Sequence, residues 1–139
     1  MRCRTTLLAV LLGLLPAAPL GATPEVRRVL YLQPLGDALP AADVALVQRA
    51  LQTFYGLEVR SLPRRSLPRE AFYSPRRRYR AERLLDHLRA WLPDDGTRVL
   101  GLTGADISTT KGRIFDWGVL GLATLDGREG VISAFRCRK

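Results

Sequence analysis

The chain has 139 residues, 47% of them hydrophobic, which suits one domain with a single core and excludes two. Its formal net charge is +9 at pH 7, so the protein is basic and polyanions have to be considered among its partners. With 1 histidine and 2 cysteines in the sequence, a tetrahedral zinc site would need mainly carboxylate ligands, an unusual set.

Residues 1–22 have the layout of a cleavable secretory signal. Arg2 and Arg4 precede an apolar run at residues 7–15, a proline ends the run, and small residues lead to Ala22. The run is shorter than the roughly 20 apolar residues that a membrane-spanning helix needs. We therefore expect export to the periplasm or the medium, with no stable membrane span after cleavage. An uncleaved anchor, or a wrongly assigned start codon ahead of a cytosolic domain, is the alternative.

Cleavage would leave residues 23–139 as the mature domain, which stays basic. It would also remove Cys3, and Cys137 would then be the single cysteine of the mature chain. An intramolecular disulfide is therefore excluded, and cysteine usage does not identify the compartment.

The first predicted elements are a strand, a helix and a second strand. The mostly apolar residues 26–32 predict a buried strand, and a loop with two prolines and a glycine follows it. A helical pattern begins at Ala41, and Gly56 predicts its end. A short strand is expected at residues 57–62. The residues expected on the apolar face of the helix are Val44, Val47, Leu51, Phe54 and Tyr55.

Residues 63–80 contain 3 prolines and 7 arginines, which predicts a basic loop. Arginines beside a tyrosine can contact phosphates and stack on bases, although a solvated basic face explains the same residues. The expected export argues against a nucleic-acid partner, so anionic envelope polymers or acidic peptides are the better candidates. The predicted basic patch consists of Arg76, Arg77, Arg78 and Arg80.

The most regular pattern in the chain follows this loop and predicts an amphipathic helix. A turn at residues 93–96 ends it. The only histidine, His87, lies at the edge of the apolar stripe, so we interpret it as a boundary residue half covered by its neighbours. The apolar stripe consists of Ala81, Leu84, Leu85, Leu88, Trp91 and Leu92.

Three more strands are predicted at residues 98–103, 117–125 and 130–135, the last two joined by a hairpin-like turn at Asp126 and Gly127. This order of elements predicts an α/β (α+β) fold, with a twisted mixed sheet of about five strands and two helices.

No catalytic or metal-binding residue is predicted within the chain. No Gly-x-Ser-x-Gly turn is present, and the serines have only His87 as a possible base. The glycines and lysine near Gly104 and Lys111 lack the order and spacing of a phosphate-binding loop. Asp106 and Asp116 are expected in a loop, where capping is the default role.

Four blocks of sequence, in order, resemble the archaemetzincin family of zinc metallopeptidases. An aromatic, proline, arginine and tyrosine lead into a helix at residues 72–81, and a strand with a Thr-x-x-Asp-Ile turn follows at residues 99–107. A Gly-Leu-Ala strand at residues 118–123 and a Val-Ser-x-x-Arg strand at residues 131–136 complete the set. The resemblance covers roughly residues 26–136.

The resemblance implies a metzincin-like amino-terminal subdomain, in which the strand at residues 117–125 is the edge that pairs with an extended peptide. Gly118 and Gly121 would let the substrate backbone approach closely, although a bulge or a packed crossing explains both glycines equally well. The predicted substrate-binding residues are Gly118, Leu120, Gly121, Leu122 and Ala123.

The family's catalytic pattern is His-Glu-x-x-His-x-x-Gly-x-x-His with a following cysteine-rich zinc site, expected shortly after Arg136. None of these residues is found here, so we expect a chain truncated before its active-site helix, inactive alone and without bound zinc, with apolar surface exposed. Two further hypotheses remain: an exported module that binds peptides without hydrolysing them, and a basic protein that binds envelope polyanions.

Overall fold

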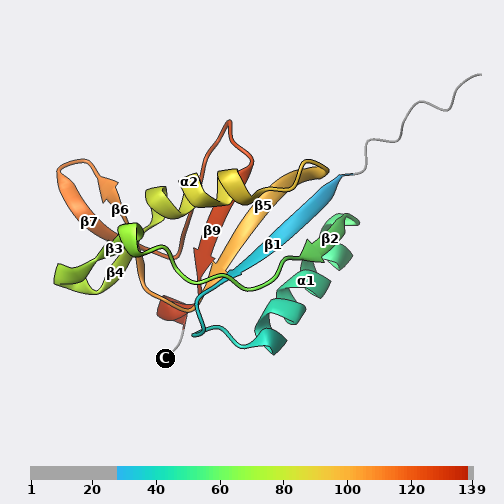
Figure 1. Cartoon of the computed structure of the whole chain (residues 1–139), viewed down its shortest axis with the longest axis horizontal. Helices are drawn as coiled ribbons and strands as arrows, with labels where there is room; N and C mark the ends of the chain where they lie inside the picture. Colours follow the sequence, from blue (N-terminus) through green and yellow to red (C-terminus); the bar gives the residue numbers. More distant parts are fainter. Residues whose placement is uncertain (1–27, 138–139) are drawn as a thin grey trace, which may run out of the picture.

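The computed structural model describes residues 28–137. The expected signal segment at residues 1–22 lies outside this range. Within it the chain forms two helices, α1 (Ala41–Tyr55) and α2 (Ala81–Trp91), two β-sheets and short 3-10 turns (Figure 1). Neither helix of the described range is long and apolar enough to cross a membrane.

The larger sheet has five strands in the order β2-β1-β5-β9-β8. Its first four strands are parallel, and β8 runs antiparallel to β9. The mixed α/β sheet with two helices that the sequence predicts is therefore confirmed. The strands are β1 (Val29–Leu35), β2 (Glu58–Ser61), β5 (Gly96–Thr103), β8 (Gly121–Ala123) and β9 (Glu129–Ser133).

Strand β1 is buried on both faces, because α1 and α2 lie on opposite sides of the larger sheet (Figure 1). Successive side chains of a strand point to opposite faces, so Tyr31 packs in the α2 core and Leu32 in the α1 core. This explains the nearly continuous apolar run. Burying a leucine such as Leu32, which is 0% exposed, stabilises the fold by about 2 kcal/mol.

The strand at the start of the domain extends farther than predicted, through Pro34. The carbonyl of Pro34 accepts a hydrogen bond from the Arg65 amide at 3.0 Å. In a strand the N and the carbonyl of one residue point the same way, so the missing N–H of Pro34 faces the segment after β2. The proline therefore leaves the pairing of β1 with β5 intact.

Helix α1 begins and ends where the sequence predicts. Gly56 adopts the left-handed conformation, with φ 62°, and its amide bonds the Gln52 carbonyl at 2.9 Å. The predicted apolar face is only partly right, because Phe54 and Tyr55 are 80% and 60% exposed. Their rings pack edge to face on each other, 4.8 Å apart, instead of on the sheet.

The smaller sheet has four strands in the order β3-β4-β6-β7. The prediction of a basic loop over residues 63–80 is wrong in part, because β3 and β4 lie within it. The hairpin of β6 and β7 was missed because residues 108–110 are polar and show no apolar alternation. These strands are β3 (Phe72–Tyr73), β4 (Arg78–Arg80), β6 (Ile107–Lys111) and β7 (Ile114–Val119).

The single strand predicted at residues 117–125 is divided between the two sheets. Its first part belongs to β7 and pairs with β6, and its second part is β8. The change of partner occurs at Leu120, whose carbonyl accepts the Ser133 amide at 2.8 Å. The predicted turn at Asp126 and Gly127 does join β8 to β9.

Candidate functional site

Strand β8 forms one edge of the larger sheet, with β9 as its only neighbour among the strands of residues 28–137. The Leu120 carbonyl and the Thr124 amide bond to β9, at 2.8 and 3.3 Å. Because backbone groups alternate along a strand, Gly121 and Ala123 direct their N–H and C=O groups away from β9. Such an edge can pair with an extended peptide.

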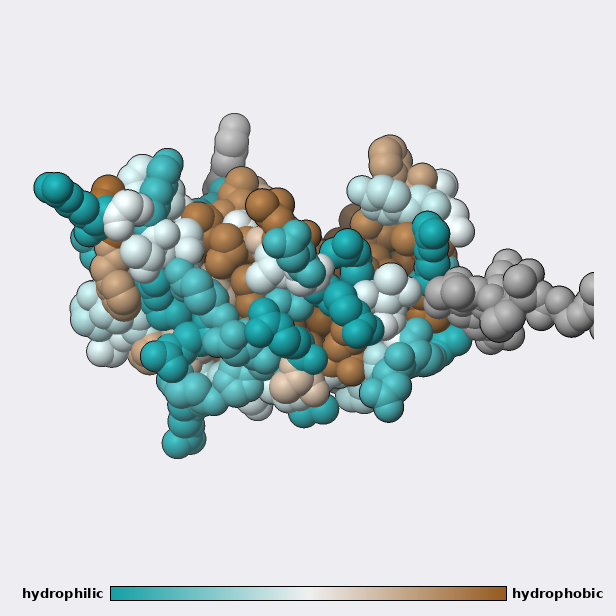
Figure 2. All heavy atoms as spheres, turned by 90° about the horizontal axis from the view of Figure 1, so that it is seen from above, coloured by the Kyte–Doolittle hydropathy of each residue, from teal (hydrophilic) through white to brown (hydrophobic). Residues whose placement is uncertain are grey.

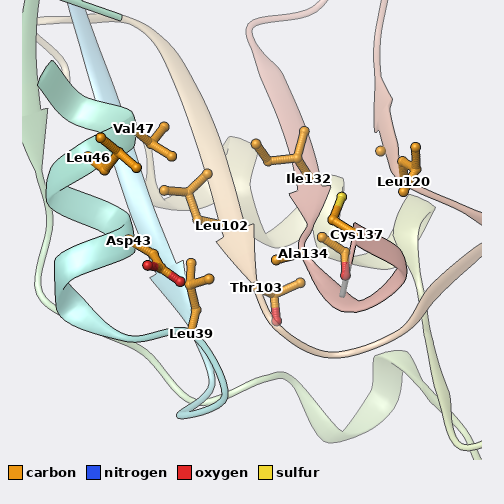
Figure 3. A pocket seen from close by; sticks show the side chains of 12 residues that line it. Leu39, Asp43, Leu46, Val47, Leu102, Thr103, Leu120, Ile132, Ala134 and Cys137 are labelled. Atoms are coloured by element: carbon orange, nitrogen blue, oxygen red, sulfur yellow. The ribbon is translucent and has the colours of Figure 1, made fainter. Parts of the chain in front are cut away.

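An apolar hollow of about 370 Å³ lies beside this edge, between α1 and the carboxyl ends of β5 and β9. Figure 3 shows Leu46 and Val47 of α1 on one side, with Ile132 and Leu120 across from them. The side chain of Leu102 lies between these walls. The hollow is large enough for one or two apolar side chains of a ligand, although it is at the small end for binding sites.

Three large apolar residues around the hollow are exposed to solvent: Leu46 by 58%, Leu120 by 56% and Ile132 by 42%. Helix α1 packs over β1 and β2 and lies to one side of β9 (Figure 1). The apolar surface predicted beside the sheet is therefore present in the described residues.

The two predicted glycines are both explained by packing. A Cβ on Gly118, which lies in β7, would collide with the guanidinium of Arg136. A Cβ on Gly121 would lie 2.9 Å from the Val131 carbonyl oxygen and 3.0 Å from Ile132 Cγ2. The packed-crossing explanation therefore accounts for both residues, and Gly118 belongs to a different sheet from the β8 edge.

The other predicted edge residues divide by face. The Leu122 side chain packs against the core under α2, whereas Leu120 lines the hollow. Ala123 is exposed at the end of β8. Contact of these residues with a peptide remains a prediction.

The four arginines of the predicted basic patch do not form one exposed surface. Arg78 donates from Nε to Asp106 and from Nη1 to Asp116, both at 2.8 Å, and its side chain is 17% exposed. Arg80, with a side chain 10% exposed, donates to the Thr110 hydroxyl at 2.7 Å. Only Arg76 and Arg77 are exposed, because the fold uses the other two as internal ion-pair partners.

Asp106 is the centre of this cluster and takes a role that the sequence did not reveal. It accepts a bidentate pair from Arg136, at 2.9 and 3.0 Å, as well as the bond from Arg78. Burial alone would raise the pKa of Asp116, but the Ser108 hydroxyl and the charge and hydrogen bond of Arg78 together outweigh it and lower that pKa. Asp116 thus stays ionised at neutral pH and is poorly suited to proton transfer.

A second buried carboxylate, Glu129 at the start of β9, is tied to α2. Its side chain is 1% exposed and accepts a bond from Arg89 Nη2 at 2.5 Å and one from the Arg128 amide at 2.9 Å. The bond from Arg89 is the main cause that lowers the pKa of Glu129, against the opposing effect of burial. The residue fixes the β8–β9 connection to the helix.

The zinc ion that the family resemblance implies does not fit these residues. Within residues 28–137, no three His, Cys, Asp or Glu side chains are grouped to hold a metal. His87 Nε2 lies 2.7 Å from Glu70 Oε1 and its ring lies 5.2 Å from that of Trp91, as expected for a boundary histidine. The buried carboxylates of Asp106 and Glu129 form ion pairs with arginines, so they do not serve as metal ligands here.

No protein-family model and no curated protein matches this sequence. Solved structures do match. The archaemetzincin of Archaeoglobus fulgidus, complexed with malonate, is 31% identical with a TM-score of 0.65, over 80% of this chain and 63% of its own. The archaemetzincin of Methanopyrus kandleri is 30% identical with a TM-score of 0.67, over 84% of this chain and 63% of its own.

A zinc-dependent peptidase from Methanocorpusculum labreanum shares the fold at 19% identity, with a TM-score of 0.60, over 76% of this chain and 64% of its own. The chain thus spans a little under two thirds of the length of each of these three proteins. The resemblance that the sequence blocks suggested is confirmed by the arrangement of the elements, and the described chain has an archaemetzincin-like fold.

Proposed function

We propose that this chain forms the peptide-docking part of an archaemetzincin-like zinc metallopeptidase. The observation that carries the proposal is the free β8 edge beside an apolar hollow, in a fold shared with solved archaemetzincins. A peptide lying along β8 would exchange hydrogen bonds with the backbone of Gly121 and Ala123. Its alternate side chains would point toward the hollow between Leu46 and Ile132.

Hydrolysis requires a zinc centre, and we assign no zinc ligand to any residue of 28–137. Sequencing the gene through and beyond codon 139, in all three frames, tests for a His-Glu-x-x-His segment. Its presence supports a zinc peptidase, and zinc-dependent cleavage of peptides by the product is the direct measurement. Its absence favours the alternative, an exported module that binds peptides without hydrolysing them.

Docking on β8 is tested by removing one outward N–H. Ala123→Pro deletes the amide that faces away from β9 and leaves the bonds to β9 in place. Fluorescence anisotropy with a labelled extended peptide of alternating leucine and polar residues should show affinity weakened by roughly tenfold or more. Ala123→Val is the matched control, because it keeps the N–H and should bind as the parent does.

Equal peptide affinity in both variants, with circular dichroism showing both folded, would reject the β8 edge as the docking site.

The polyanion hypothesis has weaker support, because two of the four arginines predicted to form its basic patch face inward. We also propose export on the pattern of residues 1–22. Amino-terminal sequencing of the protein recovered from expressing cells should then begin close to Thr23, and an intact Met1 would contradict it.

A further inference from the structure

The hairpin of β6 and β7 extends from the body of the molecule at the end occupied by the smaller sheet (Figure 1). Its turn lies at Gly112, which has φ 58°. Three large apolar residues on β7 are exposed: Ile114 by 50%, Phe115 by 54% and Trp117 by 42%. Large exposed apolar side chains gathered on one short hairpin mark a site of interaction with a protein or a membrane.

These side chains are held in place. The Phe115 ring packs against Tyr73 with centroids 5.3 Å apart, and the Arg80 guanidinium lies 4.1 Å from its centroid. The Lys111 ammonium lies 4.5 Å from the centre of the Trp117 ring. The Phe115 and Trp117 rings are therefore held in place before any partner binds, which lowers the entropy cost of binding.

The charge around this cluster is positive on the outside. Lys111 and Arg113 flank the turn, and Arg76 approaches from the neighbouring 3-10 turn, with Nε 4.0 Å from Asp116. The negative charges of the nearby acidic residues are offset by inward-facing arginines. Asp116 is 11% exposed and bonded to Arg78, and Glu82 is paired with Arg80. Figure 2 shows apolar side chains between long hydrophilic ones at this end of the molecule.

We propose that the hairpin surface, defined as Arg76, Lys111, Arg113, Ile114, Phe115 and Trp117, docks on a bilayer that contains anionic phospholipid. A bilayer interface accepts apolar side chains, the amphipathic ring of tryptophan and cations near its phosphates together. A polysaccharide or nucleic acid would satisfy the cations and leave Ile114 in water. The surface lies on a different sheet from the β8 edge, so this inference stands apart from the proposed function.

The two tryptophans of the chain provide a direct test. Trp117 belongs to the hairpin surface, whereas Trp91, the last residue of α2, packs against His87 and Arg65. Full-length Trp91→Phe and Trp117→Phe proteins are mixed with vesicles of phosphatidylcholine alone or with added phosphatidylglycerol. We expect the emission of Trp117 to shift to the blue on anionic vesicles, and the emission of Trp91 to stay unchanged.

Vesicle co-sedimentation of variants measures the two contributions separately. Reversing both tip cations with Lys111→Glu and Arg113→Glu should weaken binding by roughly 30-fold at low salt. Ile114→Gln, which removes the apolar side chain without adding charge, should weaken it by roughly tenfold. The controls are Arg49→Glu on α1 and Leu125→Gln, whose leucine is 98% exposed in the β8–β9 turn. Every variant keeps residues 1–27, so differences between variants report the hairpin.

Equal binding by the hairpin variants and the controls, or an unmoved Trp117 emission, overturns the proposal. Loss of binding in the charge variant with full retention in Ile114→Gln assigns the surface to a polyanion and overturns it as well. Loss in both hairpin variants, together with the Trp117 shift, supports docking on the bilayer.

Discussion

The two sheets of this protein are stabilised in different ways. The larger sheet is covered by apolar side chains on both faces, with Leu32 and Leu88 at 0% exposure on opposite sides. The smaller sheet contributes Ile107 to the core under α2, and it is also joined to the rest of the fold by arginine and aspartate pairs centred on Asp106. Apolar burial is tolerant of small changes in geometry, whereas a buried charge without its partner is strongly destabilising. The smaller sheet should therefore be the more sensitive to single substitutions.

The largest effect should come from Asp106→Ala, which leaves Arg136 without its bidentate partner and Arg78 with one carboxylate fewer. Breaking a buried pair in this way should lower the free energy of unfolding by about 3 to 5 kcal/mol. Urea unfolding followed by circular dichroism measures it. Asp37→Ala, at an exposed aspartate, is the control, and an equal effect in the two variants would contradict the comparison.

Leu32→Ala probes the larger sheet and should cost about 3 kcal/mol, from lost burial and the cavity left in the core. The same urea titration gives the value. In a Trp91→Phe background, Trp117 fluorescence reports the smaller sheet and circular dichroism reports the helices. We expect the two signals to change at the same urea concentration in Leu32→Ala. In Asp106→Ala, Trp117 should report unfolding at lower urea than the helices do, and coincident curves there would show that the two sheets unfold as one unit.

Gly118→Ala should be destabilising by about 1 to 2 kcal/mol, because the new Cβ displaces the Arg136 guanidinium from Asp106. In an Arg136→Ala background the same substitution should have almost no effect, since the group it would strike is absent. A double-mutant cycle by thermal or urea unfolding measures this coupling. Additive effects of the two substitutions would mean that Gly118 serves another purpose.

The smallest expected effect is the change in the free energy of unfolding when Glu129 is protonated at low pH. The pKa of Glu129 is lowered in the folded protein, mainly by its bond from Arg89. The stabilisation it provides is therefore complete above the ordinary glutamate pKa of about 4.3 and is lost as pH falls through the lower folded value. Unfolding curves between neutral pH and about pH 3 should lose less stability in Glu129→Gln than in the parent. Parallel pH profiles of the two proteins would argue against this role.

The difference between apolar packing and long-range ion pairs also explains which parts of the fold can be predicted from the sequence. Helices α1 and α2 and the buried strands follow from the spacing of apolar residues, a local property of the chain. The pairs that hold the smaller sheet join residues 28 and 30 positions apart, and no local pattern marks Asp106 as the partner of Arg78 and Arg136. The arginines were therefore assigned to a solvated patch, although two of them point inward.

The candidate site was predictable in part for a similar reason. The edge position of residues 121–123 followed from family resemblance, but the division of residues 117–125 between two sheets depends on hydrogen-bond partners distant in sequence. The exposed apolar face follows from an expectation of the family resemblance, that a further helix covers this side of the sheet. The hairpin surface was not predicted, because exposure of Ile114 and Phe115 depends on how the smaller sheet is placed.

Leu120 is the single residue between β7 and β8, and this brevity constrains how the chain can evolve. Side chains and backbone groups alternate along a strand, so inserting or deleting one residue here would turn every residue of β8 to the opposite side. Gly121 and Ala123 would then face β9, and Leu122 would leave the core under α2. Natural length variation in such proteins should therefore fall in the turns at Gly112 and Asp126 and spare this position.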